Sequence, residues 1–148
     1  MTRRQSIPQQ WLIVDDRPDW RAIGELPVGS GILILRPLIS AGLRRLTNLA
    51  RLRQLVIIHE APRSAARTHN VRELRQALLR RTPLILLSPI YPTRSHPDWK
   101  PMPRMRAASL TRLAKRRAIA LGGMNARRYA KVAPLGFIAW AGISAFRT

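Results

Sequence analysis

Two segments in the second half of the chain contain residues that could bind a phosphate group. They are Ser88-Pro-Ile-Tyr-Pro-Thr-Arg-Ser-His96 and Ala120-Leu-Gly-Gly-Met-Asn125, and each stands next to a short apolar run. A Gly-Gly pair lacks the Cβ atoms that would keep an anion away from backbone N–H groups. Asn125 can cap a helix that begins at Ala126, and the positive end of the helix dipole attracts an anion. The pattern predicts a phosphate site.

Four further side chains are candidates for chemistry because of where they stand relative to predicted strands. His59 follows a strand whose carboxyl end should face a pocket mouth, so it is the first candidate for a general acid or base. His96 is the second catalytic candidate, and a purely structural role is open for both histidines. Arg36 could clamp a phosphate with its bidentate guanidinium. Glu60 is a candidate metal ligand, and a salt bridge to an arginine is the preferred alternative.

The charge of the chain favours anionic partners. The 148 residues carry a formal net charge of +20, and 24 of the 27 basic residues are arginine. Such a charge attracts phosphorylated metabolites, nucleic acid and acidic membrane surfaces alike. Arginine on solvated helix faces is the alternative explanation. Only seven residues are acidic, and that scarcity limits any mechanism that needs a magnesium cage or a pair of carboxylates.

Length and composition predict one domain over residues 1–148, long enough to bury a core. The sequence has no cysteine, so nothing indicates disulfides or a thiolate site. The first residues lack the apolar run of a signal peptide. The longest apolar stretch, 132–146, is interrupted by proline and glycine and is too short to span a bilayer. We therefore expect a cytoplasmic protein without a membrane partner.

Short apolar runs alternate with amphipathic segments along the chain. The runs are rich in Ile, Leu and Val without alternation, which is typical of parallel strands covered on both faces. The predicted strands are 11–14, 31–35, 55–58, 84–87, 118–121 and 136–140, with a short seventh candidate at 66–69. The predicted helices are 39–54, 71–81, 104–117 and 126–132. Asn70 should cap the second of these helices, with Glu73 at the capping-box position.

The β-α-β order predicts a parallel sheet, but the chain is short for a complete barrel. An eight-fold barrel typically needs about 200 residues or more. The connection over residues 60–66 is too short for a helical crossover, so one repeat unit is missing there. We predict an α/β fold in the form of a shortened TIM-type (β/α) barrel, with an open α/β sheet as the second choice. An incomplete barrel exposes sheet edges, so a homo-oligomer is a further expectation.

Three segments together resemble a known family. They are Ser88 to His96, Ala120 to Asn125 and Trp140-Ala-Gly-Ile-Ser-Ala145. In the thiamine phosphate synthase/TenI family a G/S-P-x-[FY]-P-T-x-[ST] loop follows the sixth strand, A-[IL]-G-G-[IM] ends the seventh, and a small-residue segment with Ser-Ala follows the eighth. The chain resembles a shortened, divergent member, from about residue 67 to the C-terminus and collinearly before it.

The resemblance implies a role in thiamine biosynthesis. The family synthase joins an aminopyrimidine diphosphate to a thiazole phosphate and releases diphosphate, whereas some TenI relatives rearrange the thiazole. By position, the resemblance assigns thiazole-phosphate contacts to Gly122, Gly123, Ile143 and Ser144. It also assigns contacts with the diphosphate or the thiazole carboxylate to Thr93 and Ser95, with His96 where the synthase usually has a lysine.

The part of the family pattern that handles diphosphate is largely missing. Gln-x-Arg-x-Lys appears here as Ile34-Leu-Arg36-Pro-Leu38, and Asn-Asp appears as His59-Glu60. The unit that should supply a second magnesium-binding aspartate is absent, and Arg67 stands where a serine is expected. Mg²⁺ is therefore expected only if the protein is an active transferase, with Glu60 as its candidate ligand.

Three functions remain open from the sequence. The first is a synthase-like or TenI-type enzyme that binds a thiazole phosphate at the carboxyl end of the barrel. The second is a catalytically inactive binder of the same phosphorylated small molecule. The third is a basic nucleic-acid-associated protein. It is less favoured because the arginines are spread over several helices and no aromatic stacking platform or known nucleic-acid module is present.

Overall fold

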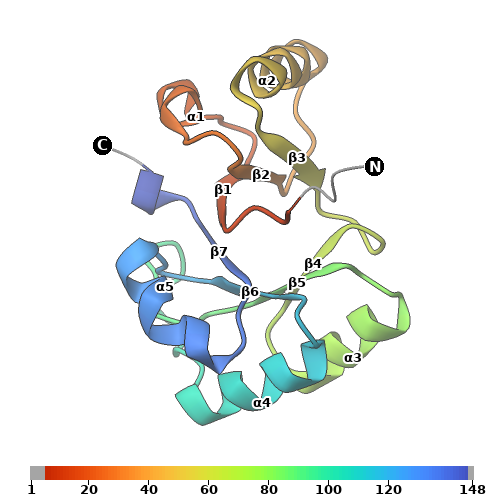
Figure 1. The fold of residues 1–148 in the computed structure, drawn as a ribbon, viewed down its shortest axis with the longest axis vertical. Helices are drawn as coiled ribbons and strands as arrows, with labels where there is room; N and C mark the ends of the chain where they lie inside the picture. Colours follow the sequence, from red (N-terminus) through yellow and green to blue (C-terminus); the bar gives the residue numbers. More distant parts are fainter. Residues whose placement is uncertain (1–5, 147–148) are drawn as a thin grey trace.

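Seven short parallel strands form one curled sheet with helices around it (Figure 1). The structure, a computed structural model, describes residues 6–146. The strands are β1 (Gln10–Val14), β2 (Gly31–Ile34), β3 (Val56–His59), β4 (Ala65–Thr68), β5 (Leu84–Leu87), β6 (Ala118–Leu121) and β7 (Ala139–Gly142). Their order in the sheet is β3-β2-β1-β7-β6-β5-β4, so the first and last strands are neighbours in its middle.

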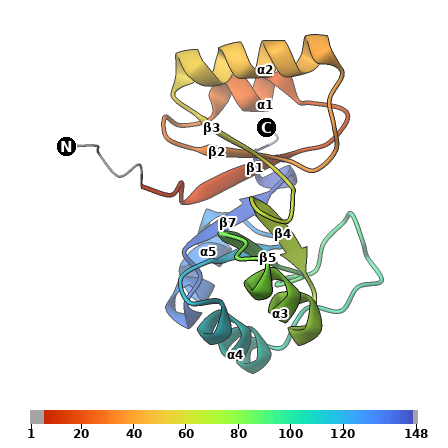
Figure 2. The same cartoon turned by 90° about the vertical axis from the view of Figure 1, so that its right-hand side faces the viewer.

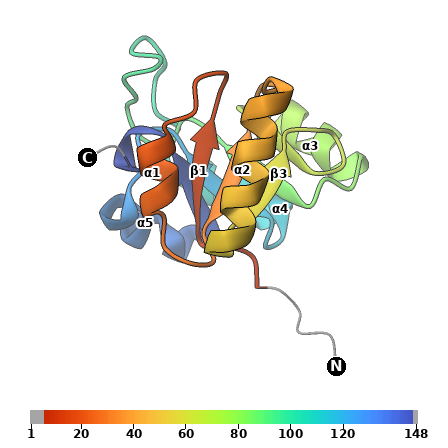
Figure 3. The same cartoon turned by 90° about the horizontal axis from the view of Figure 1, so that it is seen from above.

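The helices cover the outside of the sheet in two groups. They are α1 (Trp20–Glu25), α2 (Ser40–Arg53), α3 (Val71–Leu79), α4 (Arg104–Ala114) and α5 (Ala126–Val132), with 3-10 turns η1 (Ala133–Leu135) and η2 (Ser144–Phe146). Figure 2 shows α1 and α2 over β1–β3, whereas α3, α4 and α5 lie on the side of β4–β7. Figure 3, seen from above, shows α1 and α2 on either side of β1. No helix within residues 6–146 is long and apolar enough to cross a membrane.

The strands between the two edges of the sheet are apolar on both faces because both faces are buried. Trp11 and Ile13 point to the inside of the curled sheet, where they pack with Leu33, Leu84, Leu86, Ile119, Ala139 and Ala141. Leu12 and Val14 point outward and pack with residues of α1 and α2. On the other half of the sheet, Ile85 and Leu87 pack against α3, α4 and α5 in the same way. The unbroken apolar runs in the sequence therefore reflect an inner and an outer core.

The sheet curls like a TIM-type barrel but lacks a repeat unit, as predicted. Its two edges are β3 and β4, which follow each other in the chain and are separated by residues 60–64. In this connection the N–H groups of Ala61 and Ala65 each donate to the other residue's carbonyl oxygen at 3.1 Å. Arg67 of β4 donates to both carboxylate oxygens of Glu60, at 2.7 and 3.1 Å. A tight turn and an ion pair thus connect the two edges where a helix and a strand are missing.

Two elements differ from the sequence-based expectation. Helix α1 was not predicted, because six residues are too few to show a helical period; its cap is the Asp19 carboxylate, which accepts from Ala22 N at 3.0 Å. The last strand begins at Ala139 rather than at Gly136, whose φ of +116° instead ends the turn η1. The predicted cap of α3 is confirmed, since Asn70 Oδ1 accepts from Glu73 N at 2.9 Å.

We predict that Gly31→Ala destabilises the protein. A Cβ atom at this position would overlap the ring of Trp11, which is 1% exposed and cannot move away without disturbing the inner core. Overpacking of this kind lowers the free energy of unfolding by about 1–3 kcal/mol. Urea denaturation measures the change. Gly24→Ala in α1 is the matched control, since a Cβ there meets nothing within 4 Å; an equal loss in both variants would contradict the explanation.

Candidate functional site

A cavity of about 870 Å³ lies where the strands of the second half of the sheet end. Its walls come from the ends of β4, β6 and β7 and from the long connection between β5 and α4, which extends away from the sheet in Figure 2. Ile13 and Leu35 contribute apolar surface from the ends of β1 and β2. The carboxyl ends of parallel strands are where α/β folds place their ligands.

Seven of the ten predicted site residues line this cavity. They are Thr93, Ser95, His96, Gly122, Gly123, Ile143 and Ser144. His59, Glu60 and Arg36 do not line it, although Leu35, the residue before Arg36, does. The fold therefore brings together the three segments that carry the family resemblance. The three candidates from the first half of the chain lie outside the cavity.

The Gly-Gly pair is required by the packing of the neighbouring loop. Gly122 and Gly123 have φ of +99° and +59°, in the region that favours glycine. A Cβ on Gly122 would stand 2.9 Å from Pro89 Cα, and one on Gly123 would overlap the Pro92 carbonyl oxygen. The loop is held there by Tyr91 N, which donates to Gly122 O at 3.1 Å. The two predicted segments are thus packed directly on each other, with or without an anion.

Arg128 is a cavity residue that the sequence analysis missed. Asn125 Oδ1 accepts from Arg128 N at 2.8 Å, which caps α5 as predicted. The Arg128 guanidinium lies over the ring of Tyr91, 4.7 Å from its centroid, and donates from Nη1 to Gly123 O. No local signal in the sequence reveals this place, because it depends on how the loop with Tyr91 packs against the start of α5.

An aromatic cluster holds the outer part of the β5–α4 connection against the end of β4. The rings of His96 and Trp99 are stacked, with centroids 4.0 Å apart and planes 10° from parallel. His69, which follows β4, meets the Trp99 ring edge-on at 5.2 Å. Trp99 N also donates to His96 O at 3.1 Å. These contacts form one wall of the cavity with a flat, partly apolar surface.

Glu73 fixes His69 in this cluster. Its carboxylate accepts from the His69 backbone N–H at 2.8 Å and lies 3.1 Å from the ring Nδ1. Partial burial raises the pKa of Glu73, but the hydrogen bonds from the His69 backbone and ring and from the Asn70 amide outweigh it. The pKa of Glu73 is therefore lowered.

The predicted site residues from the first half of the chain lie outside the cavity. His59 is exposed at the end of the edge strand β3, and Arg36 is exposed in the connection after β2. Glu60 has the salt bridge that was the preferred alternative to a metal ligand, with Arg67 as its partner. Within residues 6–146 no three His, Cys, Asp or Glu side chains gather to hold a metal ion. Because Mg²⁺ is held through carboxylates, the donors present do not fit the magnesium site that the resemblance implied.

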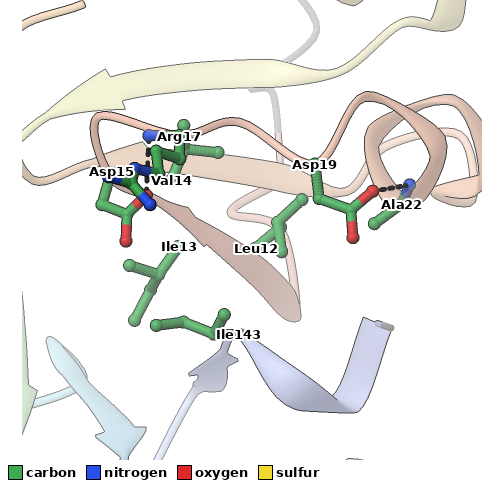
Figure 4. A pocket seen from close by; sticks show the side chains of 8 residues that line it. All are labelled: Leu12, Ile13, Val14, Asp15, Arg17, Asp19, Ala22 and Ile143. Carbon is green, nitrogen blue, oxygen red and sulfur yellow. Dashed lines mark hydrogen bonds between the residues drawn. The ribbon is translucent and has the colours of Figure 1, made fainter. Parts of the chain in front are cut away.

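The acidic residues after β1 do not form a second ligand site. They surround a void of only about 10 Å³, roughly the space for one water molecule (Figure 4). Asp15 Oδ1 accepts from Arg17 N at 2.9 Å, and Asp19 caps α1. Both carboxylates thus support the local backbone.

Comparison with known proteins supports the fold. No family model matches the sequence, and no curated protein matches it. A thiamine phosphate pyrophosphorylase from Pyrococcus furiosus has the same fold, with a TM-score of 0.76 and 14% identity over 95% of this chain and 88% of that one. A thiamine phosphate pyrophosphorylase from Bacteroides thetaiotaomicron gives a TM-score of 0.59 and 15% identity over 93% and 83% of the two chains. The chain therefore has a thiamine phosphate synthase-like fold, a shortened α/β barrel.

We predict that Gly123→Ala destabilises the protein more than Gly29→Ala. Both positions have positive φ, +59° and +82°, so alanine costs about 1–2 kcal/mol at either one. Only the Cβ at position 123 also overlaps another residue, because nothing lies within 4 Å of the one at position 29. Urea denaturation of both variants measures the difference. Equal losses would show that the close contact with the loop contributes nothing.

We predict that Glu73 stabilises the protein at neutral pH and ceases to do so in acid. A carboxyl with a lowered pKa in the folded state adds stability above its unfolded pKa, near 4.3, and loses it as the pH falls through the folded value. Because Glu73 is partly exposed, Glu73→Gln should cost less than about 1 kcal/mol at pH 7. Thermal unfolding between neutral and acidic pH should therefore show the two proteins converging. A constant difference would contradict the assignment.

Proposed function

We propose that this protein is a thiamine phosphate synthase-like protein that binds a phosphorylated small molecule of the thiazole phosphate type in the cavity. The observation that carries the proposal is the composition of the cavity wall. Three separate segments supply glycine, hydroxyl, histidine and arginine groups to it. Among the described residues that line it there is no Asp or Glu. Such a wall is suited to an anion and unsuited to a cation.

The proposed position of the phosphate is between the last two strands. Gly122 and Gly123 follow β6, and Ile143 and Ser144 follow β7, which pairs with β6. Barrels of this type bind phosphate in the loops after their last two strands. Ser144 offers a hydroxyl donor to this phosphate. We therefore assign the phosphate end of the ligand to these four loop residues.

The rest of the cavity suits a small heteroaromatic ring. Its volume of about 870 Å³ falls within the range of roughly 300–1,000 Å³ found for small-molecule pockets. The stacked His96 and Trp99 rings provide a flat surface on which a ring can lie. Thr93 and Ser95 supply hydroxyl groups from the same connection. The finer activity that we propose for this site is coupling of the bound thiazole phosphate to an aminopyrimidine diphosphate.

Calorimetric titration with thiazole phosphate tests the proposed function. We expect binding at one site per chain, and loss of binding with the dephosphorylated thiazole alcohol. Ser144→Asp should lower the affinity about tenfold or more, because it sets a negative charge against the phosphate. Ser109→Asp is the matched control, since Ser109 is exposed on α4 and does not line the cavity.

The outcomes separate binding from catalysis. Failure of thiazole phosphate to bind, or an equal loss in both aspartate variants, would overturn the proposed site. Adding aminopyrimidine diphosphate and measuring thiamine phosphate then tests coupling. Binding without product would leave a phosphate-ligand binder and reject the coupling activity.

A further inference from the structure

The cavity carries positive charge, and the described residues that line it include no carboxylate. Arg67, Arg94 and Arg128 all line it. The Arg67 charge is neutralised by Glu60. Within residues 6–146, neither Arg94 nor Arg128 forms an ion pair with a carboxylate. Two guanidinium groups therefore remain available to an anion.

Arg128 is held in position before any ligand arrives. Its guanidinium is half-buried, lies over the Tyr91 ring and uses Nη1 to donate to Gly123 O. A guanidinium carries five N–H donors in a rigid fork, so most of its donors remain after this contact. A side chain that is already ordered loses little further entropy when it binds a ligand. Arg128 is thus a prepared anion contact.

Arg94 lines the same cavity from another segment of the chain. It belongs to the β5–α4 connection, next to Thr93 and Ser95, and it is exposed. This wall and the wall of Arg128 meet where Tyr91 packs between the Gly-Gly pair and the Arg128 guanidinium. The two arginines therefore line one cavity from two different segments of the chain.

We infer that this cavity binds a diphosphate group through Arg94 and Arg128, without a divalent cation. The inference rests on the proposed function for the place of the ligand and adds how its charge is neutralised. Among the described residues the donors that would hold Mg²⁺ are missing, since Glu60 is engaged by Arg67 and no Asp or Glu of residues 6–146 lines the cavity. Guanidinium groups match pairs of phosphate oxygens with two parallel hydrogen bonds and keep their charge at any physiological pH.

Titration with inorganic diphosphate, once with excess EDTA and once with MgCl2, tests the inference. We expect one site per chain and the same affinity in both buffers within about twofold, a difference well below 1 kcal/mol. Binding that appears only with magnesium would overturn the inference. So would the absence of binding in either buffer.

Substitutions separate the cavity from the general charge of +20. In EDTA, Arg128→Gln and Arg94→Gln should each lower the affinity for diphosphate about tenfold or more, as expected for hydrogen bonds between charged groups. Arg127→Gln is the matched control, because Arg127 neighbours Arg128 on α5 but is exposed and does not line the cavity. An equal loss in Arg127→Gln, or none in the two cavity variants, would overturn the inference. Because Arg94 is exposed in a loop, its variant keeps the test valid if Arg128→Gln unfolds.

A parallel titration with thiazole phosphate keeps the two proposals apart. If thiazole phosphate binds and diphosphate requires magnesium, the inference fails and the proposed function stands. If diphosphate binds in EDTA while thiazole phosphate does not bind, the cation-free anion site stands and the proposed function fails.

Discussion

The shape of the sheet depends on the short connection between β3 and β4, which contains only five residues, 60–64. A parallel crossover normally takes a dozen or more residues, so these two strands cannot pair and instead form the edges of the sheet. The Ala61–Ala65 turn and the Glu60–Arg67 ion pair connect the edges. The Glu60 carboxylate, which follows β3, is therefore engaged by Arg67 of β4. A short connection thus determines both the shape of the barrel and the charge at its ligand end.

The second half of the chain depends instead on a close backbone contact. The loop after β5 lies on Gly122 and Gly123, and Arg128 covers Tyr91 from the start of α5. The same residues therefore build the wall of the cavity and offer donors to a ligand. The site is packed against the sheet at its base and is more exposed at its outer rim, where Trp99 is 42% exposed.

Most strands could be predicted from their unbroken apolar runs, and most helices from apolar periods that are long enough to detect. The capping residues Asn70 and Asn125 were equally predictable, since a cap depends on local sequence. Helix α1 and the position of Arg128 at the cavity could not be predicted, because one is too short and the other depends on packing between two loops. His59 and Arg36 lie outside the cavity because they are exposed, whereas the preceding residues Ile58 and Leu35 pack against the inner core; no local pattern reveals which of two neighbouring residues faces inward.

The pairing of β1 with β7 has a consequence for how the chain folds. Gln10 pairs with Trp140, so this contact closes a loop that contains nearly all the described residues. Every other neighbouring pair of strands joins segments that are close along the chain. Closure of so long a loop has the largest entropy cost in the sheet, and such distant contacts slow folding. During synthesis, the parts containing β1–β3 and β4–β6 can form no common sheet until β7, the last strand, has been made.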